Sequence, residues 1–314
     1  MALTYSELNT VSKQYYDDKM YPQVYEDSPF FMQMKKRNKI MYDGGIQIQF
    51  ATRYRKLASA NEVGPREQLS IGGKDTRTAA VLDWSYYAAD TSLEWDERIK
   101  NAGKGKIIDL ARDKAKELKD DMSDRLFTNF VTTTSQGANI LVPLAVIVDA
   151  ADSYGGIAVA DSADWKSVED TTTTTMTLYG TGSLSRSFNS ATFGKDHPTN
   201  YYTTRDLLSK LESLLQPQVR YESEDALDKK FPNVLFNGGK AYGDVYMPES
   251  YFYGIDMNAF ELACKTGEDR VTEWFSLEQA GRPNTLGKYC FWVGNVKCNM
   301  RRTSFKYTAL DYTK

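Results

Sequence analysis

Histidine is almost absent from this sequence: His197 is the only one among 314 residues. Most general acid–base mechanisms, catalytic triads and zinc or iron sites depend on histidine. His197 precedes Pro198 in a polar stretch, so we expect it to be an exposed bystander. A carboxylate enzyme without histidine remains an alternative, but nothing distinguishes one pair among the 42 acidic residues. We therefore predict that the chain is not an enzyme.

Complete glycine motifs for nucleotide binding or hydrolysis are also missing. The segment 180–183 does not place its serine as a nucleophile elbow requires. Segments 72–74 and 238–240 both read Gly-Gly-Lys, without the upstream glycine and following Ser or Thr of a phosphate-binding loop. The sequence therefore predicts no catalytic, cofactor-binding or metal-ligating residues, and no cofactor.

Cysteine is scarce, with Cys264, Cys290 and Cys298 as the only examples. An odd number without a close Cys-x-x-Cys pair argues against a disulfide framework or a zinc site. We expect buried thiols in a protein made in a reducing cytoplasm.

A basic surplus and long apolar runs are lacking too. The net charge is −3, whereas proteins that bind nucleic acid by neutralising phosphates are basic. No segment approaches the roughly 20 apolar residues that span a bilayer. The first residues do not resemble a secretory signal peptide. These features argue against a dedicated nucleic-acid-binding domain, a membrane protein or a secreted one. They are compatible with a protein wall that merely encloses nucleic acid.

Aromatic residues are plentiful, at 13% of the chain with 21 tyrosines. Tyrosine suits surfaces that become buried on association, but a tyrosine-rich strand protein explains the count equally well.

The pattern of residues 46–95 predicts a long hairpin. Apolar residues alternate with polar ones across 46–55, which is typical of a strand. A polar stretch at 56–75 separates this strand from a second extended segment, 76–95. Two strands with so few apolar groups need support from another surface.

Residues 106–131 carry the clearest helical period. The apolar positions fall within an arc of roughly 100°, as expected for a core-facing stripe. They are Ile107, Ile108, Ala111, Ala115, Leu118, Met122 and Leu126. The opposite side forms an acidic ridge of Asp109, Asp113, Glu117, Asp120 and Asp124. This ridge is either a solvated face or a charge-complementary contact with a neighbouring subunit.

Several shorter elements are also predicted. A helix should begin near Pro29, capped by Asp27 or Ser28. Another should cover 202–215, capped by Thr203 or Thr204. Extended segments are expected at 140–148, 171–175, 233–236, 244–246, 289–301 and 303–310.

Four segments, in this order, resemble the major capsid proteins of tailed bacteriophages, whose fold is shared with herpesvirus shells and encapsulins. They are Ser28-Pro29-Phe30-Phe31, the strand 84–97 leading into the helix at 107–110, Gly155-Gly156-Ile157 followed by 163–165, and the segment 291–302. Each match is weak alone, whereas their order along nearly the whole chain is specific.

The resemblance implies an α+β fold with five parts. They are an N-terminal arm (1–44), an extended β-hairpin loop (45–96), a peripheral domain with a spine helix (97–131), an axial domain (132–255) and peripheral return strands (256–314).

It also implies a structural role in a virion. The chain would assemble with itself as hexamers and pentamers into an icosahedral or prolate shell around double-stranded DNA. Portal, scaffolding and decoration proteins would be further partners, and no membrane is involved. An encapsulin-like shell or another virion structural protein is the alternative.

Overall fold

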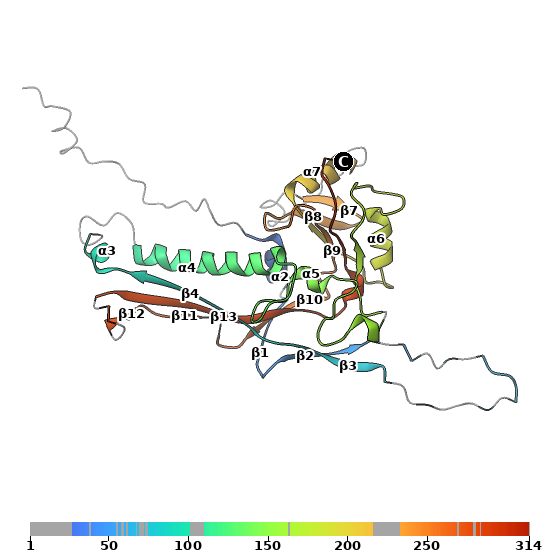
Figure 1. Ribbon diagram of the computed structural model, residues 1–314, viewed down its shortest axis with the longest axis horizontal. Coiled ribbons are helices and arrows are strands. Elements are labelled where there is room, and N and C mark those ends of the chain that lie inside the picture. Colours follow the sequence, from blue (N-terminus) through green and yellow to red (C-terminus); the bar gives the residue numbers. More distant parts are fainter. Residues whose placement is uncertain are drawn as a thin grey trace, which may run out of the picture. The chain divides into compact units, whose positions relative to one another are not determined.

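The computed structural model describes residues 27–313, apart from two longer gaps and several short ones. The longer gaps are 101–109 and 216–232, and the short ones are 38, 55, 58–59, 61, 67, 69–71, 73–74, 163, 269, 279–280 and 283. The chain divides into two compact units (Figure 1). Residues 88–122 and 271–290 belong to the first unit, whereas 26–87, 123–270 and 291–314 belong to the second.

The fold mixes helices with strands. The helices are α2 (Pro29–Lys36), α3 (Trp95–Lys100), α4 (Leu110–Phe127), α5 (Leu144–Ile147), α6 (Leu184–Ala191) and α7 (Arg205–Leu215). The strands are β1 (Ile40–Asp43), β2 (Ile48–Arg53), β3 (Arg77–Leu82), β4 (Ser85–Leu93), β5 (Val168–Asp170), β6 (Asn200–Thr203), β7 (Asn233–Phe236), β8 (Gly239–Gly243), β9 (Phe252–Ile255), β10 (Phe260–Lys265), β11 (Arg270–Val271), β12 (Phe275–Ser276), β13 (Leu286–Cys298) and β14 (Phe305–Tyr307).

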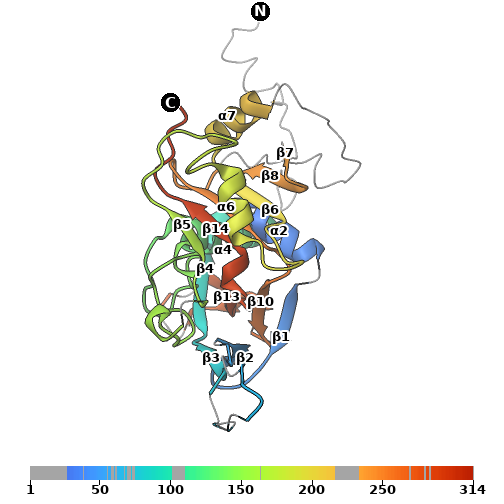
Figure 2. The same ribbon diagram turned by 90° about the vertical axis from the view of Figure 1, so that its right-hand side faces the viewer.

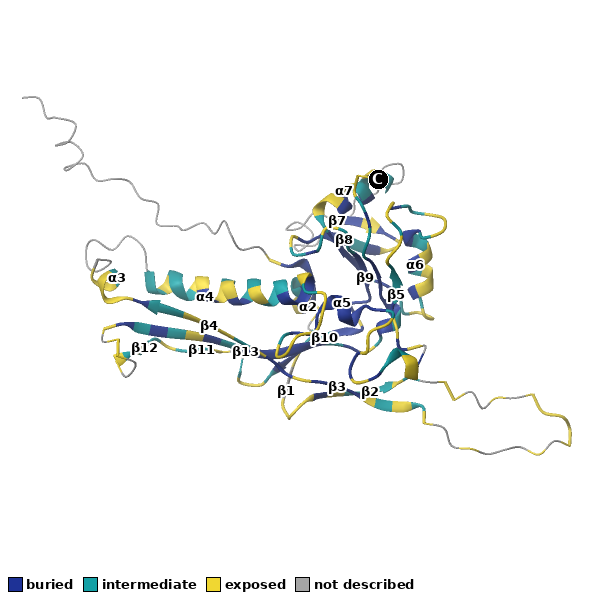
Figure 3. Cartoon of the chain, viewed as in Figure 1, coloured by how far each residue is buried: buried dark blue, intermediate teal, exposed yellow. Residues whose placement is uncertain are grey.

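A six-stranded mixed sheet forms the centre of the second unit, in the order β5-β14-β9-β6-β8-β7. β5 pairs with β14 in parallel, as does β6 with β8. Helices α6 and α7 lie by this sheet (Figure 2). The strands carry most of the fully buried aromatic side chains, and Figure 3 shows them as the most continuously buried part of the unit.

One face of this sheet packs into an apolar core with the two helices. α7 is amphipathic and buries Leu207, Leu208 and Leu211. α6 contributes Leu184 and Ala191. The leucine spacing of α7 is the i, i+1, i+4 pattern that places apolar side chains on one side of a helix.

The second sheet contains β1, β10, β13 and β11 in that order, with β4 and β12 also paired to β13. β1 runs parallel to β10, with Ile40 opposite Leu262. The predicted strand at 289–301 is confirmed, with shifted bounds, as the 13-residue β13.

The predicted hairpin is confirmed where its strands pair. β2 and β3 are antiparallel, with Ile48 opposite Leu82 and Arg53 opposite Arg77. The second extended segment, however, is divided at residues 83–84 into β3 and β4, which belong to different sheets. Within β2 only Ile48 is buried, so this two-stranded sheet has little core of its own.

The predicted long helix is confirmed as α4 over the described residues. Leu118 and Met122 of the predicted stripe are buried. The helix ends at Phe127 and continues into one π-helical turn at Thr128–Thr132. Ile107, Ile108 and Asp109 lie outside the described residues.

Three strand predictions were wrong. The apolar run 140–148 is buried from Leu141 onward and contains the one-turn helix α5 after Pro143. The strand prediction failed because a short run of buried residues has no period that separates helix from strand. Residues 171–175 form bends, in which Asp170 accepts hydrogen bonds from the amides of Thr172 and Thr173, each at 2.9 Å. Residues 244–246 form a turn in which the Tyr246 amide donates to Asp244 Oδ1 at 3.0 Å.

The actual partner strand of β7 is β8, reached through a tight turn. Asn237 and Gly238 have φ values of +44° and +77°. Asn-Gly is a preferred pair for such hairpin turns, because both central residues need positive φ.

Two helix starts and one strand also required correction. Tyr202 and Thr203 belong to β6, so α7 begins at Arg205, and the Thr204 hydroxyl accepts from the Leu207 amide at 3.3 Å. Ser28 is the N-cap residue of α2 and Pro29 follows it as predicted, but no side-chain cap forms. The predicted strand 303–310 is reduced to β14, which follows a 3₁₀ turn at Arg301–Thr303.

Candidate functional site

A row of five polar side chains crosses one face of the central sheet. The strand register pairs Lys306 with both Glu169 and Tyr253. It also pairs Tyr202 with Tyr253 and with Tyr242. Cross-strand partners point to the same side of a sheet, so these five side chains share one face.

The opposite face is apolar in the same register. Phe305 lies opposite Gly254, which is paired in turn with Tyr201, and Tyr201 is paired with Ala241. A Cβ at Gly254 would come within 2.2 Å of the Phe305 ring, so only glycine fits between these strands. The sheet thus separates the apolar core from a buried polar layer.

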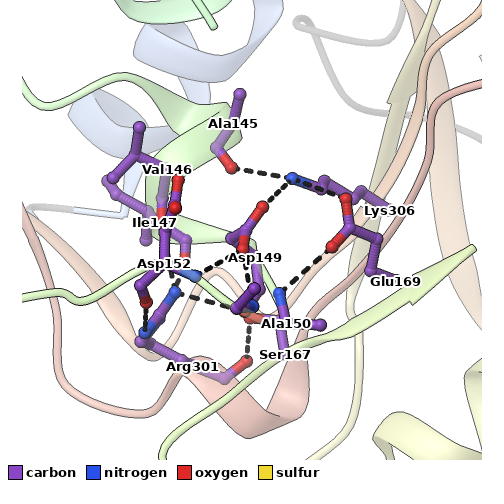
Figure 4. A network of polar contacts seen from close by, with 11 residues as sticks. Ala145, Val146, Ile147, Asp149, Ala150, Asp152, Ser167, Glu169, Arg301 and Lys306 are labelled. Atoms are coloured by element: carbon purple, nitrogen blue, oxygen red, sulfur yellow. Dashed lines mark hydrogen bonds and ion pairs between the residues drawn. The ribbon is translucent and has the colours of Figure 1, made fainter. Parts of the chain in front are cut away.

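Lys306 lies next to Glu169, the end of the polar row on β5 (Figure 4). Its ammonium group donates to Asp149 Oδ2 at 2.5 Å and to the Ala145 carbonyl at 3.0 Å. Glu169 Oε1 lies 3.0 Å away and completes its surroundings. Lys306 is only 4% exposed, so all three donor positions of its ammonium group have protein acceptors.

Asp149 is held by the main chain as well as by Lys306. Its Oδ1 accepts from the amides of Ala151 and Asp152, each at 2.7 Å. Burial alone would raise the pKa of Asp149, but the Lys306 hydrogen bond and the two amides outweigh it and lower the pKa. This carboxylate therefore stays ionised in the fold.

Arg301 lies beside this group and is 1% exposed. Among the described residues, its guanidinium donates only to main-chain carbonyls, at distances of 2.8 to 3.3 Å. The acceptors are Val146, Ile147, Asp149, Asp152 and Trp165. The planar group also stacks on the ring of Tyr154, 5.4 Å from its centroid. Burial lowers the pKa of Arg301, but the normal pKa of arginine is so high that it keeps its charge.

Together Lys306, Arg301, Asp149 and the partly exposed Glu169 form a charge-balanced cluster, in which the first three are buried. Lys306 contacts both carboxylates, whereas Arg301 binds the main chain beside them, and the Ala150 amide donates to Glu169 at 3.3 Å. Because its polar groups bind one another and the main chain, such a cluster can position chain segments. It joins the turn after α5 to β5 through Glu169 and to β14 through Lys306. Asp149 and Lys306 are 157 positions apart.

The other end of the polar row contacts α2. The Gln33 amide donates to the Tyr242 hydroxyl at 2.7 Å, and the Ser28 hydroxyl donates to Asp244 at 2.7 Å. Phe30 is fully buried next to Phe130, with ring centroids 4.7 Å apart. The Ser28 hydroxyl is used here rather than as a helix cap.

The cysteines and the histidine complete the set of candidate reactive residues that the structure describes. All three cysteines are buried thiols outside any disulfide, as predicted, and burial raises the pKa of Cys298 to about 12. His197 is half-buried against Phe188, with ring centroids 5.7 Å apart, so its predicted exposure was wrong. Within the described residues, no group of His, Cys, Asp and Glu could hold a metal ion. Over that same part of the chain, no helix has the length and hydrophobicity that crossing a bilayer requires.

The sequence did not single out any member of the buried cluster. Lys306 stands between two aromatic residues, Phe305 and Tyr307, which was a usable signal that the lysine lies in a buried strand. Arg301 adjoins Arg302, and nothing in the pair indicates that one is buried and the other half-exposed.

Comparisons with known proteins identify the fold. No protein-family model and no curated protein matches the sequence. Among solved structures, the capsid asymmetric unit of cyanophage A-1(L) aligns with a TM-score of 0.72 at 12% identity, over 98% of this chain and 99% of that chain. The chain has the phage capsid fold. The capsid of a native GTA particle aligns with a TM-score of 0.68 at 9% identity, over 99% of this chain and 100% of that chain. A chain from Mycobacterium phage Bobi aligns with a TM-score of 0.62 at 10% identity, over 99% of each chain.

The phage capsid fold confirms the predicted fold class and the resemblance on which it rested. The segment Ser28-Pro29-Phe30-Phe31 begins α2, and the segment 291–302 supplies most of β13. Gly155 and Gly156 form a turn with φ values of +63° and +74°. The five-part division of the chain stays a prediction.

Proposed function

We propose that this chain is a major capsid protein, which assembles with itself into the icosahedral or prolate shell of a tailed phage. The observation that carries the proposal is the extent of the structural likeness, which covers 98% of this chain and 99% of the cyanophage capsid chain. The role is structural rather than enzymatic. An encapsulin-like shell is less favoured, because the similar structures named above come from phage and GTA particles.

The hairpin supports a role in assembly. β2 and β3 form a sheet of their own, and Ile48 is the only buried residue of β2. A two-stranded sheet is marginally stable by itself in water. Contacts with neighbouring subunits would compensate for the entropy lost in ordering it, and many copies of a modest interface would stabilise a closed shell.

The proposed division of labour follows the expected domains. The arm (1–44) and hairpin loop (45–96) would reach neighbouring subunits, the spine helix would support the peripheral domain, and the axial domain (132–255) would pack around the symmetry axes. Hexamers and pentamers would be the assembly units. Portal, scaffolding and decoration proteins would be further partners, and the shell would enclose double-stranded DNA without reading its sequence. We place the protein in the virion capsid after synthesis in the host cytoplasm.

Electron microscopy after size-exclusion chromatography tests this function. The protein is expressed alone and then together with the neighbouring virion genes. Closed polyhedral particles, or discrete pentamers and hexamers, are expected in at least one condition. A stable monomer in both conditions would refute the capsid role.

A hairpin deletion sharpens the test. The Tyr54 amide donates to the Thr76 carbonyl at 3.2 Å, so the chain can be closed near this point after residues 58–74 are removed. The deleted subunit should remain folded by circular dichroism yet form no closed shells. Normal particles from this variant would count against an assembly role for the hairpin.

A further inference from the structure

We propose that a basic groove beside β2 of one copy receives the acidic face of α4 from a second copy. The inference rests on the proposed function and adds to it a specific pair of contacting surfaces. The groove has a volume of about 550 Å³, and its lining includes Arg53, Lys56, Trp165, Phe193, Met300 and Arg302. The acidic face consists of Asp113, Glu117, Asp120 and Asp121.

The groove combines an apolar base with a cationic rim. Trp165 is buried, and its indole donates to the Tyr154 carbonyl at 3.1 Å, which fixes the ring in place. Phe193 is 47% exposed, and the Arg302 guanidinium lies 4.5 Å from its ring centroid. An exposed aromatic ring beside cations is typical of a surface that becomes buried on association.

The positive charge of the groove is only partly balanced within the subunit. Arg302 forms an ion pair with Asp164 at 2.8 Å. Arg53 and Lys56 are exposed, and within the described part of the chain their side chains form no ion pair. Two cations on this rim are therefore available to a carboxylate-bearing partner.

The acidic face of α4 has the complementary character. Glu117 and Asp121 are exposed and stand four residues apart on the helix. Side chains at this spacing lie about 6 Å apart on one side of a helix, so two carboxylates project together. In the described residues, neither side chain forms an ion pair, whereas the nearby Lys114 is already engaged by Glu97 at 2.6 Å.

The second copy is the occupant that the charges favour. A shell built from one kind of chain needs heterologous contacts, in which two different patches of the same chain complement each other. The groove supplies exposed cations and α4 supplies exposed carboxylates. Opposite charges placed across an interface also suppress wrong pairings, because like charges in contact are costly.

A charge-swap experiment tests this pairing. One variant carries Arg53→Glu and Lys56→Glu, and a second carries Glu117→Lys and Asp121→Lys. Each should fold, as judged by circular dichroism and urea unfolding, but its yield of closed particles should fall by at least about tenfold. The chain that carries all four changes restores the complementarity with inverted signs and should recover particle yield.

The matched control is Lys166→Glu with Lys195→Glu. It reverses the charge of two exposed lysines that do not line the groove, although Lys166 follows Trp165 and Lys195 is two positions from Phe193. This variant changes the net charge as much as the groove variant does, and its particle yield should stay within about twofold of the original.

Three outcomes would overturn the inference. If both two-residue variants assemble normally, neither surface is an interface. If the groove variant fails and the four-residue variant does not recover, the groove serves another partner, such as DNA or a different virion protein. If the control loses as much yield as the groove variant, net charge is responsible. In all three cases the unmodified chain still forms shells, so the proposed function survives. The proposed function itself fails if the unmodified chain forms no shells.

Discussion

Lys306 Nζ lies 2.5 Å from Asp149 Oδ2, although the two residues are 157 positions apart and Lys306 is 4% exposed. This ion pair connects the turn after α5 to β14, the second strand of the central sheet. Its position in a buried layer makes it sensitive to the loss of either partner, because an uncompensated buried charge is costly.

Replacing Lys306 with methionine should strongly destabilise the subunit. Methionine keeps the unbranched shape but leaves the buried Asp149 and the partly exposed Glu169 without their cation. We expect the free energy of unfolding to fall by about 3–5 kcal/mol, measured by urea unfolding of the unassembled subunit. Arg302→Met is the control, since its ion pair with Asp164 is partly exposed and should cost no more than about 1 kcal/mol. Equal losses for the two variants would show that the buried pair has no special weight.

Asp149 and Asp256 should give opposite pH dependences of stability. The pKa of Asp149 is below its ordinary value of 3.8 in the folded protein. Its contribution to folding stability is therefore fully present above pH 3.8 and is lost as the pH falls through the lower folded-state pKa. Burial raises the pKa of Asp256, so its folded state favours the protonated carboxyl and loses stability as the pH rises from 3.8 through the raised pKa.

The comparison uses Asp149→Asn and Asp256→Asn, unfolded in urea between about pH 3 and pH 7. With rising pH, the original protein should gain stability relative to Asp149→Asn and lose stability relative to Asp256→Asn. Parallel pH profiles for the two variants would contradict these assignments.

Gly155→Ala should loosen the attachment of the hairpin to the rest of its unit. The new Cβ would lie 2.8 Å from the Ala80 Cβ, and φ at this position is +63°. The Gly155 carbonyl also accepts from the Val81 amide at 3.0 Å, so displacement of this turn would disturb β3. We expect a loss of about 1–3 kcal/mol and faster hydrogen exchange at Val81.

Gly156→Ala is the matched control for that substitution. Its φ is +74°, but a Cβ there meets no atom within 4 Å. It should show the backbone cost of about 1 kcal/mol without the altered exchange at Val81. If both variants change Val81 equally, the contact with Ala80 is not the cause.

Two tyrosines on different strands should respond differently to loss of the hydroxyl. The Tyr307 hydroxyl donates to the Ser183 carbonyl at 2.9 Å and lies 2.6 Å from the Ser187 hydroxyl. The Tyr201 hydroxyl is buried and has no hydrogen-bond partner among the residues that the structure describes. Tyr307→Phe should therefore cost about 1–2 kcal/mol, whereas Tyr201→Phe should be neutral or stabilising. Thermal unfolding of both variants distinguishes these results, and an equal loss would indicate that Tyr201 has a bound partner such as water.

The sequence alone predicted helices and strands correctly where a periodic pattern is long enough to be diagnostic. The alternation from Ile48 to Arg53 predicted β2, and the spacing of Leu118 and Met122 predicted the buried side of α4. The Ser-Pro pair predicted the start of α2, because proline favours the first helical turn. The order of four short segments predicted the capsid fold, which the structural likeness confirms.

Only the tertiary structure decided the short buried elements and the polar layer. The apolar run that contains α5 has no period that separates helix from strand, so the surrounding core set its conformation. The row from Glu169 to Tyr242 draws on five strands, and its members meet because of long-range strand register. The sequence places each of these side chains on its own strand, but burial and pairing depend on which strands become neighbours. A buried lysine and a solvated one look alike in sequence, and the fold distinguishes them by supplying Lys306 with two carboxylates and a carbonyl.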